Sequence, residues 1–148
     1  MSKMLTLITV MFLLALGAYA GAQEPVEKVS KSSYTITLTK LDAAFKSARL
    51  LILGEFDYQR MQKMVGKNIR GAKGFNIFRP DLGIPIFEND YRASLEIPLK
   101  LVVYEREDGK VVIRYRRPSE VFKPYKGLSD LGKSLDKLLD ELTDAAIK

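Results

Sequence analysis

The chain has 148 residues, no cysteine, no histidine and a formal net charge of +6 at pH 7. Without these two residue types it has no disulfides, no Ser-His or Cys-His nucleophile, and none of the usual ligand sets of zinc, copper and c-type haem, so we expect no metal and no cofactor. The positive charge is modest; we expect a solvated surface, or one that meets anionic lipid, polysaccharide or small anions, rather than nucleic acid.

The first 22 residues predict a secretory signal peptide. Lys3 forms a short positive region, residues 4–18 are apolar, and the small residues Ala18, Ala20 and Ala22 offer cleavage after Ala20 or Ala22. Because the apolar run is short for a membrane span, we expect a periplasmic or secreted protein without stable membrane insertion after cleavage. The alternative is an uncleaved N-terminal membrane anchor.

Residues 23–33 are polar and lack periodicity, which is typical of a flexible N-terminal linker. A single domain is expected over residues 34–148. Tyr34–Lys40 alternates β-forming residues with a period of two and therefore predicts a strand. The apolar residues of 41–50 recur at helical spacing and predict a short helix.

The next predicted elements are a strand that ends near Phe56 and a helix over residues 58–65. Asp57 is placed to cap this helix, and Gly66 can form its C-terminal stop. One apolar face is expected on the helix, with Tyr58, Met61 and Val65. Residues 72–80 then predict a strand that Pro80 closes, because proline has no N–H for the ladder.

Strands over residues 99–107 and 110–117 flank Asp108-Gly109, a dipeptide typical of a tight hairpin. Pairing the residues on either side of this turn would place Val103 opposite Arg114. Residues 117–127 are expected to form an ordered loop.

Residues 129–148 predict a long helix capped by Ser129, because leucines recur there at helical spacing. The resulting order of elements favours an α+β domain, an antiparallel sheet of about five strands with helices packed on one face. The other face need not be covered, and a function could reside there.

Residues 74–122, followed by the leucine-rich helix, contain a series of short motifs at characteristic spacing. These are Arg79-Pro80, Leu82-Gly83, Ile97-Pro98, Val103-Tyr104-Glu105, Gly109 and Pro118. Their spacing resembles the uncharacterised bacterial and archaeal family named domain of unknown function 302, over roughly residues 34–147.

The resemblance implies a TATA-binding-protein-like fold, often paired as a homodimer, and it brings no established activity. It also implies a cysteine before an Asn-Pro step in many relatives. Here the corresponding residues are Phe78-Arg79-Pro80, so a thiol role cannot operate in this chain.

Arginine and aromatic residues gather in the second half of the chain. Guanidinium groups bind anions bidentately and stack on aromatic rings, which suits a flat or amphipathic anion. Strand alternation leaves exposed the face that carries Val112, Arg114 and Arg116, although a plain solvated surface explains the same pattern. The candidate ligand-binding or interface residues are Phe78, Arg79, Phe87, Tyr91, Arg92, Tyr104, Arg114 and Arg116.

Two acid pairs, Glu55 with Asp57 and Glu88 with Asp90, could act as general acid and base or bind a hard cation. Helix capping and turn formation explain the same acids structurally. We therefore favour a non-catalytic protein that binds a small anionic or amphipathic ligand, or assembles as a homodimer, through the open sheet face and residues 80–98. The alternative is a carboxylate-dependent hydrolase or a cation-binding protein.

Overall fold

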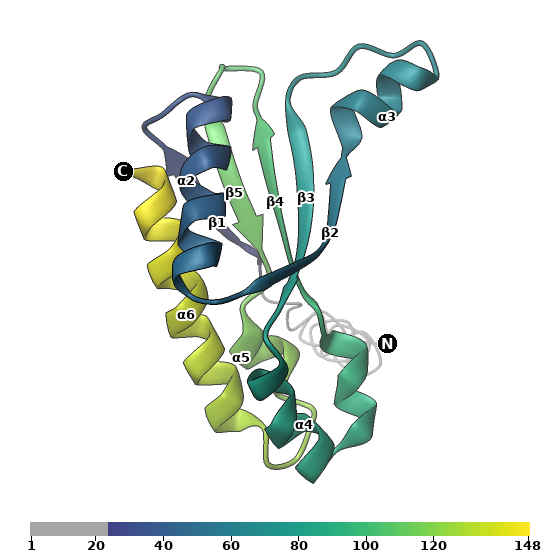
Figure 1. Ribbon diagram of the computed structural model, residues 1–148, viewed down its shortest axis with the longest axis vertical. Coiled ribbons are helices and arrows are strands. Elements are labelled where there is room, and N and C mark those ends of the chain that lie inside the picture. The colour runs from purple at the N-terminus through teal and green to yellow at the C-terminus, as the bar shows by residue number, and fades with distance from the viewer. Residues whose placement is uncertain (1–23) are drawn as a thin grey trace, which may run out of the picture.

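The computed structural model describes residues 24–148, which form a five-stranded antiparallel sheet with helices packed on one face (Figure 1). The expected α+β class and one-sided helical layer are confirmed. The predicted signal peptide lies outside the described residues. Among residues 24–148, no helix combines the length and hydrophobicity that a membrane crossing requires.

The strands lie in the order β1-β5-β4-β3-β2, so β1 and β2 are the two edges. The strand bounds are β1 Val26–Ser30, β2 Leu51–Asp57, β3 Ala72–Phe78, β4 Leu99–Glu105 and β5 Val111–Tyr115. The helix bounds are α2 Tyr34–Ser47, α3 Tyr58–Met64, α4 Ile84–Asn89, α5 Pro118–Val121 and α6 Ser129–Ile147, with 3-10 helices η2 Pro80–Gly83 and η3 Tyr91–Glu96. Helices α2 and α6 pack side by side, and the core lies between them and the sheet (Figure 1).

The first strand is not where the sequence pattern placed it. The expected linker over residues 23–33 is wrong, because β1 lies within it and pairs with β5. The pattern concealed β1 because two of the side chains that it turns toward the helices are polar. Lys28 forms ion pairs with Asp140 and Asp144 of α6 at 2.9 and 2.7 Å, and Ser30 is buried.

The expected strand Tyr34–Lys40 is also wrong, because these residues form the first half of α2. The buried residues Thr37, Leu41 and Phe45 are spaced four apart, which is a helical stripe. A polar residue can begin this stripe because the Thr37 hydroxyl lies within hydrogen-bonding distance of Ser33 O, at 2.9 Å, and Ser30 Oγ, at 2.8 Å. Burial of this stripe outweighs the β propensity of the threonines.

The predicted hairpin between β4 and β5 is present, but its register differs by one residue. Arg106 N donates to Lys110 O at 2.8 Å, and Gly109 adopts a φ of 79°. A turn followed by a left-handed glycine adds one residue to the loop. Arg114 therefore pairs with Val102, one residue before the predicted partner.

The long C-terminal helix is confirmed, with corrections at its start. Ser129 is not its cap, because Leu128 holds that position and no side chain bonds there. The expected loop over residues 117–127 contains α5, which packs on α6. Asp136 of α6 accepts a hydrogen bond from Ser119 N at 2.9 Å and so holds the first turn of α5.

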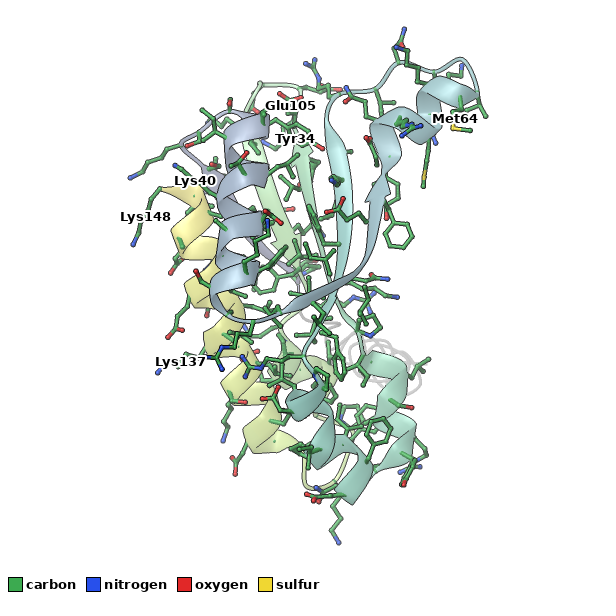
Figure 2. All side chains as sticks on the ribbon, viewed as in Figure 1. Tyr34, Lys40, Met64, Glu105, Lys137 and Lys148 are labelled. Carbon is green, nitrogen blue, oxygen red and sulfur yellow. The ribbon has the colours of Figure 1, made fainter. Side chains whose placement is uncertain are left out.

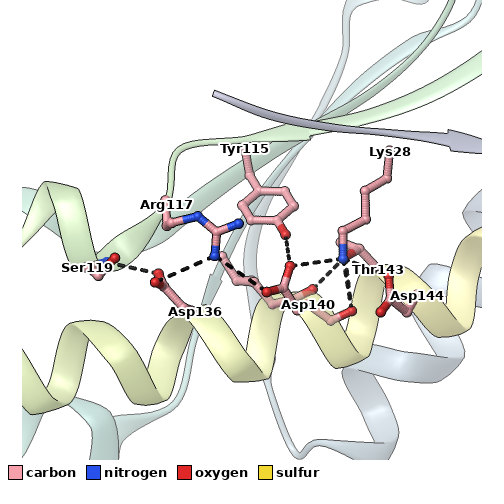
Figure 3. Close-up of polar contacts among 9 residues, drawn as sticks. Lys28, Tyr115, Arg117, Ser119, Asp136, Asp140, Thr143 and Asp144 are labelled. Carbon is pink, nitrogen blue, oxygen red and sulfur yellow. Dashed lines mark hydrogen bonds and ion pairs between the residues drawn. The ribbon is translucent and has the colours of Figure 1, made fainter. Parts of the chain in front are cut away.

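Asp140 of α6 ties this helix to the sheet (Figure 3). It accepts a hydrogen bond from the Tyr115 hydroxyl at 2.7 Å and forms ion pairs with Lys28 at 2.9 Å and Arg117 at 3.5 Å. Burial alone would raise the pKa of Asp140. The hydrogen bonds from Tyr115 and Lys28 and the nearby positive charges outweigh burial and hold this pKa below its ordinary value.

We expect Asp140→Asn to lower the free energy of unfolding by about 1.5 kcal/mol at neutral pH, since charge-assisted hydrogen bonds are lost at a partly exposed site. Because the folded-state pKa is lowered, the contribution of Asp140 is present above its unfolded pKa and is lost as pH falls through the folded value. Urea unfolding should therefore show the two proteins converging in acid. Asp130→Asn, at a fully exposed carboxylate, is the control. Equal stabilities of Asp140→Asn and wild type at neutral pH would contradict this account.

Candidate functional site

The face of the sheet opposite α2 and α6, which we call the open face, is not covered by either of these helices (Figure 1). Its composition follows from the register, because paired residues in antiparallel strands point to the same side. One row of paired residues crosses all five strands of the open face. The row consists of Glu27, Arg114, Val102, Gly74 and Phe56.

An aromatic pair lines the β2 side of this face. The rings of Phe56 and Tyr58 stack with centroids 6.3 Å apart. The Tyr58 ring lies over Gly74, because a Cβ at Gly74 would be only 2.8 Å from the Tyr58 hydroxyl. Glycine in the inner strand β3 thus lets the start of α3 fold back against the open face.

Arg114 and Tyr104, both predicted site residues, are engaged with a neighbour on the open face. Glu27 of β1 forms an ion pair with Arg114 and accepts a hydrogen bond from the Tyr104 hydroxyl at 3.1 Å. Burial would lower the pKa of Arg114, but the bond to Glu27 holds this pKa above its ordinary value. The charge of Arg114 is therefore already balanced within the sheet.

Lys100 and Arg116 differ from Arg114 because neither forms an ion pair with any described residue. Leu101 pairs with Tyr115. Lys100 precedes Leu101 and Arg116 follows Tyr115, so the antiparallel register places these two residues opposite each other on the same side of the sheet. Both side chains are exposed. The expected exposure of this face is confirmed for Arg116 and wrong for Val112, which is fully buried.

A hollow of about 710 Å³ brings these groups together. Its lining includes Phe56, Tyr58, Leu95, Lys100, Val102 and Arg116. Val121 of α5 and Leu139 of α6 also border the hollow, so it extends from the open face toward these helices. This volume is within the range of small-molecule sites.

Two of the predicted arginines are engaged away from this hollow. Arg79 donates to Ala48 O at 2.7 Å, just beyond α2, and pairs with Asp81 at 2.7 Å. Arg92 pairs with Asp90 at 2.7 Å. Both arginines stabilise the chain around η2, α4 and η3, and the structure does not group them with Arg116.

The predicted aromatic residues of the same segment form a separate cluster. A Cβ at Gly83 would lie 3.1 Å from the Phe78 ring and 3.3 Å from the Phe87 ring, so the two rings flank this glycine. Phe87 also meets Tyr91 edge to face, with centroids 5.5 Å apart. Tyr91 is 73 % exposed, so this cluster is a surface feature and not a pocket wall.

The acid pairs do not converge. Glu55 forms an ion pair with Lys73 at 2.7 Å, and Asp57 caps α3. Both acids therefore lie near the start of β3. Glu88 and Asp90 belong to the segment that follows the other end of β3. Within residues 24–148, no three acidic side chains are grouped so that they could hold a metal ion.

Sequence reasoning missed three lining residues, Phe56, Tyr58 and Lys100. Tyr58 was expected on the apolar face of its helix, yet no residue of α3 is buried. No sequence motif around Lys100 indicates a binding site. The only signal for it is the hairpin register, because the correct pairing of Leu101 with Tyr115 places Lys100 beside Arg116.

The architecture defines a two-layer α+β protein with one sheet face free of the α2 and α6 layer. A family model described as "Domain of unknown function DUF302" matches residues 26–147, and the chain belongs to this family. The fold is similar to a solved structure titled "Crystal structure of uncharacterized conserved protein DUF302 from Bacillus stearothermophilus". The TM-score is 0.76 at 16% sequence identity, and the alignment covers 84% of this chain and 99% of the other. No curated protein matches the chain.

Proposed function

We propose that the open face binds an amphipathic organic anion, a carboxylate, sulfonate or phosphate group carried on an apolar body. One observation carries the proposal. The exposed cations Lys100 and Arg116 share a hollow with the stacked rings of Phe56 and Tyr58.

Electrostatics supports the anionic part of the ligand. Two like charges side by side in a concave surface raise the local positive potential. Glu27, the acid on the same face, is committed to Arg114 and Tyr104. A ligand anion could meet Lys100 and Arg116 through charge-assisted hydrogen bonds, with the arginine offering a bidentate fork.

The apolar part of the ligand would contact the remaining lining. Phe56 and Tyr58 offer ring surfaces, and Val102 and Leu95 offer aliphatic surface. Leu95 is 81 % exposed, so covering it would remove apolar area from water. A purely inorganic anion would leave this surface unused.

The lining favours binding over catalysis. Its one carboxylate is Glu96, whose Oε1 accepts a hydrogen bond from the Tyr125 hydroxyl at 2.7 Å. No second described acid borders the hollow to form an acid-base pair with Glu96. We also propose that the protein acts after export, on the basis of the signal pattern in residues 1–22.

Competition between two ligands of equal chain length tests the ligand class. A chain of residues 24–148 is titrated with the fluorescent anion 1-anilinonaphthalene-8-sulfonate, and laurate or dodecanol is then added. We expect saturable binding of the fluorophore and its displacement by laurate at least about tenfold more effectively than by dodecanol, since the charged contact is worth more than about 1.4 kcal/mol. Equal displacement by the alcohol would reject an anion site.

Assembly as a homodimer is the second candidate function, and a neighbouring surface that shares only Leu95 with the hollow favours it. In the segment over residues 84–95, Ile84, Phe87, Tyr91 and Leu95 are 55, 45, 73 and 81 % exposed. Ile86 and Ala93, buried between them, hold the segment in place. Sedimentation equilibrium measures this assembly directly and separately from ligand binding.

A further inference from the structure

Residues 58–70 form an arm that projects from the end of the sheet, beyond β2 and β3 (Figure 1). The arm consists of α3, a turn at Gly66 and the return toward β3. It is folded on itself, because Lys67 N donates to Gln62 O at 2.9 Å and Gln59 Nε2 donates to Ile69 O at 3.1 Å. No residue of α3 is buried, so the helix contributes little to the core.

The arm exposes apolar side chains that the rest of the described fold does not cover. Met64 and Val65, where the helix ends, are 80 and 70 % exposed, and Met61 and Ile69 are 46 and 40 % exposed. Figure 2 shows Met64 at the outer part of the arm, away from the sheet. The apolar face that the sequence predicted for this helix therefore exists but faces solvent.

The same arm is strongly cationic. Arg60, Lys63, Lys67 and Arg70 are all exposed, and residues 58–70 contain no acidic residue. None of these four side chains forms an ion pair with a described residue. The carboxylate of Asp57, just before the arm, accepts a hydrogen bond from the backbone N–H of Arg60 as the helix cap.

We propose that the arm docks the protein peripherally on an anionic phospholipid surface. Lysine and arginine near such a surface are attracted to its negative potential, and exposed Met, Val and Ile side chains can enter the boundary between headgroups and acyl chains. The combination of positive charge and exposed apolar side chains favours an anionic lipid surface over a second copy of the chain or a nucleic acid as the partner. Two copies of the arm would repel each other, and a nucleic acid would leave Met64 and Val65 without an apolar partner.

Co-sedimentation with lipid vesicles tests the proposal on a chain of residues 24–148, which contains the whole described fold. Vesicles contain phosphatidylcholine alone or with about 30 % phosphatidylglycerol. We expect binding only to the anionic vesicles, and its loss at about 0.5 M salt, because screening shortens the reach of the charges. Wild-type protein that stays in the supernatant with anionic vesicles would overturn the proposal.

Variants separate the contribution of the cations from that of the apolar side chains. Arg60→Gln/Lys63→Gln should lower the partition coefficient about 30-fold, since each cation contributes about fivefold at a lipid surface. Met64→Ser/Val65→Ser should lower it about tenfold through lost apolar burial. Lys133→Gln/Lys137→Gln, on the exposed face of α6, removes the same charge and should change it less than twofold.

Thermal unfolding followed by circular dichroism should show unchanged folding of the arm variants, because α3 buries no residue. Undiminished binding by Met64→Ser/Val65→Ser would reject lipid contact, and equal losses in the α6 control would reject the arm as the site. A dimer that dissociates on Met64→Ser/Val65→Ser, without vesicle binding, would assign the arm to a second copy instead.

Discussion

Gly132→Ala is expected to lower the free energy of unfolding by about 2 kcal/mol, although alanine is the better helix former by about 1 kcal/mol. A Cβ at position 132 would lie 2.7 Å from the Cα of Ser119 and 3.4 Å from the carbonyl oxygen of Pro118. These are backbone atoms of α5, so no side-chain rotation can relieve the clash. Helices α5 and α6 must separate, and this separation also weakens the bond from Ser119 N to Asp136.

Urea unfolding followed by circular dichroism measures this change. Lys133→Ala, at the next and exposed position of α6, also introduces an alanine but without the clash, and it should be neutral or slightly stabilising because lysine is already a good helix former. A Gly132→Ala variant as stable as wild type would show that α5 and α6 are not in close contact at Gly132.

The packing of α5 also matters for the proposed site. Pro118 and Val121 border the hollow, and Pro118 follows Arg116 by only two residues. The close contact at Gly132 thus fixes the chain that leaves β5 toward α5. We expect changes at Gly132 to affect ligand binding only through this positioning.

Lys100→Glu/Arg116→Glu is expected to weaken laurate binding about 100-fold or more. Charge-assisted hydrogen bonds contribute about 1.5 kcal/mol each, and two of them amount to about 3 kcal/mol before any repulsion from the new carboxylates. Both side chains are exposed, so the fold should tolerate the change. Isothermal titration calorimetry with laurate measures the affinity.

The matched control is Lys133→Glu/Lys137→Glu, which changes the net charge equally on α6. If both double variants weakened binding to the same extent, overall charge and not the hollow would attract the anion. Unchanged affinity in Lys100→Glu/Arg116→Glu would remove these two cations from the site.

Sequence patterns predicted most of the fold where burial and periodicity agree. The leucines of α6, the Asp57 cap of α3 and the Asp108-Gly109 hairpin all have local signals strong enough to identify the element. The first strand and first helix were misplaced, because the positions that face the core include half-buried Lys28 and buried Ser30 and Thr37, which carry no hydrophobic signal. Their polar groups are satisfied only by contacts made in the folded state.

The site was predictable only in part, for a similar reason. Arg116 could be found from strand alternation, and it is free of ion pairs in the described structure. Arg79, Arg92 and Arg114 look alike in sequence, yet each is paired with an acid. Asp81 and Asp90 are sequence neighbours of their arginines, whereas only the fold brings Glu27 to Arg114. The place of Lys100 depends on a register that a single extra turn residue shifts.

The proposed anion site is tested most directly by mapping a laurate titration onto the backbone amides of the ¹⁵N-labelled chain of residues 24–148 by NMR. Binding in the hollow predicts that the largest saturable shift changes fall on Gly74, Lys100, Val102 and Arg116. Changes confined to residues 59–70 of the arm or to residues 84–94, or no saturable change, would contradict a ligand site on the open face.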